Sequence, residues 1–125
     1  MDENELAKII VDCCFKIHST LGPGLFESVY EEILHHELKK HSLKAEKQVY
    51  LPVIYENIKI DLGFRADIIV EDKVIIEIKS VETILAVHKK QLLTYLKLAN
   101  LKLGLLINFN SALIRDGITR IANKL

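Results

Sequence analysis

Two acidic residues and a lysine in the middle of the chain have the types and spacing suited to metal-assisted hydrolysis. Asp67 precedes Glu77 by ten residues, and Lys79 follows Glu77 by two. Residues two apart on a β-strand share a face, so a strand here points Glu77 and Lys79 the same way. Paired carboxylates suit Mg²⁺ or Mn²⁺ rather than zinc, and a nearby lysine would stabilise negative charge that develops on a phosphate.

The loop between the two predicted strands decides whether Asp67 reaches Glu77. A three-residue loop at 71–73 pairs Val70 with Val74 and sets Asp67 opposite Glu77. A two-residue loop would instead turn Asp67 to the other face. Opposed carboxylates repel each other and are tolerated when a cation lies between them. The alternative is a solvent-facing set of charges that forms ordinary ion pairs.

Three helices are predicted from apolar residues that recur every three or four positions, over 6–21, 25–41 and 83–99. Asp2 and Glu5 form a capping-box start for the first helix, and a Gly-Pro-Gly stop separates it from the second. The adjacent Cys13 and Cys14 point in different directions on a helix, so we expect core residues rather than a disulfide.

Four strands are predicted from alternating or continuous apolar runs, at 49–55, 58–70, 74–80 and 103–109. Gly63 indicates a bulge or a close backbone approach. After a turn at 116–117, the chain ends in a strand or a helix that the pattern does not distinguish. The order ααβββαβ predicts an α/β fold of one domain over residues 1–125, with helices packed on a mixed sheet.

Charge is divided unevenly along a chain whose formal net charge is zero. Residues 83–125 carry seven basic residues and one acidic residue, so the remaining 82 residues carry the other ten bases and sixteen acids. The basic third either contacts phosphates or forms ordinary solvated faces. No apolar run approaches the roughly 20 residues that cross a bilayer, and the N-terminus is acidic. We therefore expect a cytoplasmic protein that does not enter a membrane.

The Asp67-(x)9-Glu77-x-Lys79 pattern, followed by a helix that carries Gln91 and Tyr95, resembles the PD-(D/E)XK nuclease superfamily. Gln91 and Tyr95 are four residues apart and share a helix face, as in the Q-x-x-x-Y element of the RecB-type branch. Residues 24–30 read G-x-x-E-x-x-Y. Together with the strings RAD, IIEIKS, VH and LGLLINF, they make the chain similar to the GxxExxY family of bacteria and archaea.

This resemblance implies a restriction-endonuclease-like core and assigns roles to individual residues. Glu27, Asp67 and Glu77 would bind the metal, and Lys79 would be the catalytic lysine. Gln91 and Tyr95 would position substrate or water. The superfamily's proline is absent, because Arg65 and Ala66 stand directly before Asp67.

Three further residues have open roles. Tyr30 either shares the site with Glu27 or is a core aromatic with its hydroxyl at the rim. His88 either faces the cleft that Gln91 faces or lies at the surface. Arg65 either holds a phosphate or pairs with Glu27.

The expected function is a Mg²⁺- or Mn²⁺-dependent nuclease that hydrolyses phosphodiester bonds in DNA by in-line attack of water. The alternative is a catalytically silent binding or assembly module with the nuclease fold, within a DNA-processing complex. A short chain with half its residues hydrophobic makes a homodimer a reasonable expectation.

Overall fold

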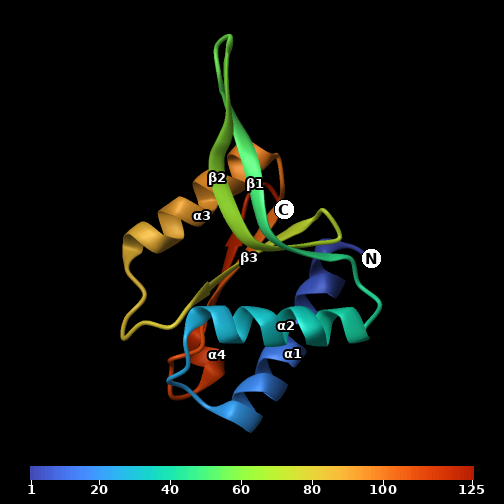
Figure 1. Ribbon diagram of the computed structural model, residues 1–125, viewed down its shortest axis with the longest axis vertical. Coiled ribbons are helices and arrows are strands. Elements are labelled where there is room, and N and C mark those ends of the chain that lie inside the picture. The colour runs from blue at the N-terminus through green and yellow to red at the C-terminus, as the bar shows by residue number, and fades with distance from the viewer.

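The computed structural model describes residues 1–125 (Figure 1). Four of its elements are helices: α1 (Glu3–Leu21), α2 (Glu27–Lys40), α3 (Ala86–Ala99) and α4 (Ile114–Gly117). Five are strands: β1 (Ala45–Tyr55), β2 (Ile58–Val70), β3 (Val74–Lys79), β4 (Leu103–Asn108) and β5 (Ile118–Ala122). The predicted order is confirmed as far as β4. The unassigned last stretch contains both alternatives, a single helical turn followed by a strand.

The strands form one mixed sheet in the order β1-β2-β3-β4-β5. Only β3 and β4 run parallel, and the other neighbours are antiparallel. A parallel pair needs a crossover connection, and α3 lies within that connection. The predicted mixed sheet with helices packed on it is therefore confirmed. None of the helices combines the length and the apolar character that a membrane span requires.

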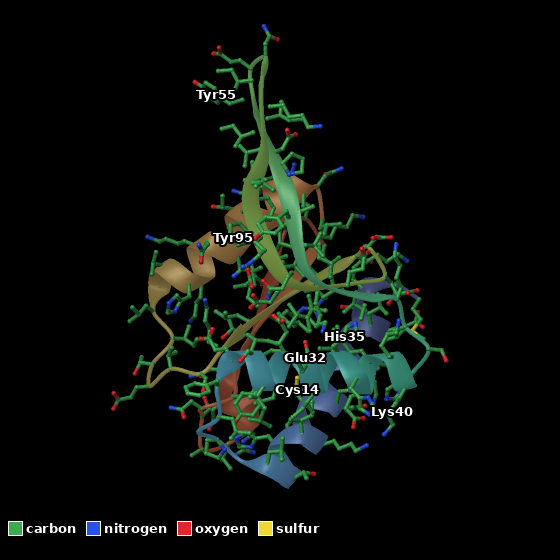
Figure 2. All side chains as sticks on the ribbon, viewed as in Figure 1. Cys14, Glu32, His35, Lys40, Tyr55 and Tyr95 are labelled. Carbon is green, nitrogen blue, oxygen red and sulfur yellow. The ribbon has the colours of Figure 1, made fainter.

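Two apolar clusters hold the helices to opposite faces of the sheet. The larger cluster joins α1 and α2 to one face, and the smaller joins α3 to the other (Figure 1). Strands β3 and β4 lie between the clusters and are buried almost throughout, which explains their continuous apolar runs. Cys13 and Cys14 are both buried with free thiols, as predicted, and Cys14 lies between α1 and α2 (Figure 2).

The β1–β2 hairpin extends beyond the helices as an arm, which we define as residues 52–63 (Figure 1). Tyr55 pairs with Ile58, so the predicted two-residue turn is confirmed. The register shifts between Leu51 and Val53, opposite Gly63. A Cβ on Gly63 would lie 2.3 Å from Val53 Cγ2 and 2.6 Å from Val53 N. The bulge and the close backbone approach therefore both occur.

Tyr30 is a residue of the larger apolar cluster. Its side chain is fully buried, and its ring stacks on Phe109 with 4.4 Å between centroids. The hydroxyl donates to Gly22 O at 2.6 Å and accepts from Leu25 N at 3.2 Å. Of the two roles predicted for Tyr30, the core aromatic fits this position, because both hydrogen-bonding positions of the hydroxyl hold the loop that leads into α2.

The Tyr30→Phe substitution should lower the free energy of unfolding by about 1–3 kcal/mol, because Leu25 N and Gly22 O lose a buried partner. Urea unfolding followed by circular dichroism measures this loss. Tyr55→Phe is the matched control, since Tyr55 is exposed and should unfold like the wild type. Equal stability of Tyr30→Phe and the wild type would contradict this role.

Candidate active site

The site begins where β2 and β3 stop pairing. Their ladder joins Val70 to Val74, Ile69 to Ile75 and Ile68 to Ile76, and then ends. The predicted three-residue loop and the Val70–Val74 pair are therefore confirmed, whereas Asp67 and Glu77 do not pair within the ladder. At the next position, carboxylate oxygens instead of backbone carbonyls accept the hydrogen bonds of the backbone N–H groups. Glu77 Oε2 accepts from Asp67 N at 3.3 Å, and Asp67 Oδ2 accepts from Ile78 N at 2.8 Å.

Strand β2 changes face at Asp67. Ile68 packs in the cluster under α1 and α2, whereas Ala66 packs in the cluster under α3. Strict alternation would place both residues on one face, so the alternation of side chains breaks at Asp67, although the register with β1 is the same before and after it. Gln48, opposite Asp67 on β1, has a left-handed backbone with φ 54°. These paired irregularities turn Asp67 toward α2. Glu77 instead follows the alternation of β3 and lies on the face of Ile75, toward α3.

A hollow of about 180 Å³ opens between α2 and this irregularity. It is lined by residues of α2, β1, β2 and β3: Glu27, Ser28, Glu31, Gln48, Arg65, Asp67 and Ile78. The structure thus brings together three of the residues that the sequence singled out, namely Glu27, Arg65 and Asp67.

Glu31 and Gln48 also line the hollow, and the sequence analysis missed both. Gln48 Nε2 donates to a carboxylate oxygen of Glu31. Burial and the charge of Asp67 raise the pKa of Glu31, while the Gln48 hydrogen bond opposes that rise. Glu31 lies four residues after Glu27, so their shared helix face was a signal that could have found it.

Glu27 is tied to the end of β3. Its Oε1 accepts from Ser80 N at 3.2 Å, and Ser80 Oγ donates to Leu25 O at 2.7 Å. These bonds fix the start of α2 next to the residue that follows Lys79. On its other side Glu27 borders a larger hollow of about 590 Å³, whose lining includes Phe26 and Asn110.

Glu77 is the most strongly perturbed acid in the site. Burial, followed by the charge of Asp67 and a side-chain hydrogen bond with it, raises the pKa of Glu77 to about 9. The charge of Lys79 lowers this pKa, and its effect is the smallest of those that act on Glu77. Glu77 therefore holds a proton at neutral pH in the metal-free protein, and this proton removes the repulsion between the two carboxylates.

Helix α3 brings Tyr95 to the same acids. Its ring stacks on Phe64 with 4.2 Å between centroids, where α3 passes the sheet (Figure 2). Burial, and then the charges of Glu77 and Asp67, raise the pKa of Tyr95. The Tyr95 hydroxyl is therefore close enough to sense both acids. Gln91 lies one turn earlier on α3 and is exposed.

Arg65 lines the hollow, whereas the contact that His88 makes is at the start of α3. His88 Nδ1 accepts from Leu85 N at 3.0 Å, so this imidazole caps α3. Arg65 is exposed, and its guanidinium lies 6.0 Å from the ring centroid of Tyr50. It lines the same hollow as Glu27, and its role in holding a phosphate stays a prediction.

The predicted convergence of three acids on one cation does not occur. No group of three Asp, Glu, His or Cys side chains lies close enough to hold a metal ion. The reason is that Glu27 is held by Ser80 N, while Asp67 and Glu77 bond around the end of the ladder. The Asp67–Glu77 pair nevertheless fits a hard divalent cation in donor type, because a cation would replace the proton that the pair holds.

Comparison with known proteins gives one family assignment. Residues 4–121 match a family model described as the PD-(D/E)XK nuclease superfamily. The match includes all of the site residues described above. A search of the curated proteins and a search of the solved structures each gave no match.

The stability of the metal-free protein should decline as the pH rises, because of Glu77. The unfolded chain loses this proton near the ordinary pKa of 4.5, whereas the folded chain keeps it up to about 9. The free energy of unfolding therefore falls between these two values. Glu77→Gln, which is neutral throughout, should remove most of that decline in urea titrations with a chelator at about pH 5, 7 and 9.

Glu82→Gln is the matched control, because Glu82 is an exposed acid outside the site. It should keep the wild-type dependence of stability on pH. A decline of wild-type size in Glu77→Gln would show that the proton does not belong to this residue.

Proposed function

The chain belongs to the PD-(D/E)XK nuclease superfamily, and on this premise we propose a metal-dependent nuclease that hydrolyses phosphodiester bonds in DNA. The observation that carries the proposal is the Asp67–Glu77 pair, in which Glu77 is buried, with Lys79 two residues further on β3. Two acids forced together lower stability unless something compensates for their repulsion. A divalent cation does so, and membership of a nuclease superfamily implies a nucleic acid as the substrate.

We assign Asp67 and Glu77 as the main ligands of Mg²⁺ or Mn²⁺, with Glu27 approaching from α2. Such an ion would polarise the phosphoryl oxygen and lower the pKa of the attacking water. Reaching the ion requires Glu27 to exchange its bond with Ser80 N for the new ligand. The assignment to the GxxExxY family and to the RecB-type branch rests on the sequence motifs and is part of this proposal.

The remaining residues act on the phosphate and the water. The Lys79 ammonium lies near Glu77 and stabilises the negative charge that develops on the scissile phosphate. Tyr95 and Gln91 orient substrate or water from α3. Arg65 and the exposed lysines of α3 contact flanking phosphates, where each contact adds attraction without sequence preference.

Phe26 suggests that the nucleic acid bound at the site is single-stranded. Its side chain is 82% exposed, more than any other large hydrophobic residue, and it lines the hollow beside Glu27. An exposed aromatic ring stacks with the bases of an unpaired strand, whereas a duplex keeps its bases stacked on one another. A base on Phe26 would place the adjoining phosphate near Glu27.

Lys79→Ala should lower kcat on DNA oligonucleotides by roughly 100-fold or more, because a charge that stabilises the transition state is lost. Its melting temperature and its Mn²⁺ affinity by calorimetry should remain close to those of the wild type. Lys73→Ala, in the loop just before β3, is the matched control and should keep full activity. If the wild type leaves single- and double-stranded DNA and RNA intact with either ion, the chain is instead the silent binding module.

Phe26→Ala should raise KM for single-stranded DNA by roughly 5- to 150-fold, the range expected for one stacked base. KM for a blunt duplex should change little. Phe26→Trp preserves an aromatic face and should behave like the wild type, whereas Phe26→Leu should resemble the alanine variant. Equal effects on single strands and duplexes would rule out stacking at this position.

A further inference from the structure

The arm carries an unusual density of exposed apolar side chains. Five of them are at least half exposed, and they lie close together on both strands: Ile54, Tyr55, Ile58, Ile60 and Leu62. Figure 2 shows Tyr55 near the tip, far from the helices. Side chains of this kind on a two-stranded ribbon make it marginally stable in water, because neither face is covered.

The arm also has an open backbone edge on β2. Strand β3 pairs with β2 only at residues 68–70, so the arm part of β2 has β1 as its one neighbour. Alternate residues of an antiparallel strand direct N–H and C=O toward the same side. Counting from the Tyr55–Ile58 pair that closes the turn, Lys59 directs its groups away from β1, and Asp61, which follows the last regular pair Val53–Ile60, has no partner on β1. Such an edge is a template for another strand.

We propose that the occupant of this edge is a second copy of the chain, which forms a two-fold antiparallel β2–β2 pairing centred on Ile60. In this register Lys59 of each copy lies opposite Asp61 of the second copy, so two pairs of opposite charge form across the interface. Ile58 likewise lies opposite Leu62 of the second copy, and the two Ile60 side chains meet at the axis. Opposed pairs of both kinds stabilise antiparallel strands.

The net charge of the arm favours a second copy of the chain over a nucleic acid or an anionic membrane. The arm contains two acids, Glu56 and Asp61, and one base, Lys59, so its net charge is negative. Phosphate-rich partners require the opposite sign. Two copies of a chain with zero net charge, by contrast, do not repel each other.

The geometry of the arm leaves room for the second copy. Because the pairing is centred near the turn, the two arms overlap only around their tips. In each copy the arm extends away from the helices (Figure 1), so this pairing would place the helices of the two copies at opposite ends of the joined arms. Asp67 lies further along β2, toward its helices, so the pairing leaves the candidate active site open. The inference therefore does not depend on the proposed nuclease activity.

Exchanging the two charges tests the register directly. Sedimentation velocity of the full chain at several concentrations should show a dimer for the wild type. Lys59→Asp and Asp61→Lys each place like charges opposite one another twice, and each should weaken dimerisation by about tenfold or more. The double variant Lys59→Asp/Asp61→Lys restores opposite charges and should restore the dimer.

The other outcomes overturn the proposal. A wild type that stays monomeric at tens of micromolar rules it out, and so does binding of such a monomer to lipid vesicles. Dimers that persist in both single variants use another surface. Circular dichroism should show native folds for all variants, because Lys59 and Asp61 are exposed. Nuclease assays on the same variants should show unchanged kcat, which separates a failure of dimerisation from a failure of the proposed function.

Discussion

The opposition of Asp67 and Glu77 is the constraint to which the rest of the structure adapts. At this point the β2–β3 ladder stops, and carboxylate oxygens accept from the main-chain amides of Asp67 and Ile78. A stable sheet gains nothing from two adjacent acids, one of them buried. Departures from regular structure of this kind cluster at functional sites, where the surrounding fold maintains them.

The surrounding fold maintains this site through two apolar layers. Strands β3 and β4 are buried on both faces, so the end of β3 that carries Glu77 and Lys79 is held rigidly. Helix α2 presents Glu27 from one side, and α3 presents Tyr95 from the other. Tyr30 sits under the loop before α2 and fixes its path through two hydrogen bonds. Each functional side chain therefore depends on a different part of the core.

Sequence reasoning located the elements and the main acidic pair, because both follow from local rules. Hydrophobic periodicity predicts the helices, and a three-residue loop dictates which residues oppose each other on β2 and β3. The left-handed backbone at Gln48 has no such signal, since glutamine is not a typical turn residue, and so the exit of Asp67 toward α2 was not predicted. Tyr30 was ambiguous for another reason: an aromatic ring beside an acid suits a core and a site equally. The position of Glu27 depends on its bond to Ser80, which is distant in sequence.

The parallel pairing of β3 with β4 also has a consequence for biosynthesis. Val74 pairs with Leu103, which leaves the ribosome only after the whole crossover has been made. The β1–β2 hairpin is local and can form on the nascent chain, but one edge of β3 stays uncovered until β4 emerges. The acids are therefore among the last features to reach their final places, so a chain that stalls before residue 103 carries every proposed site residue yet lacks β4, the strand that covers the open edge of β3.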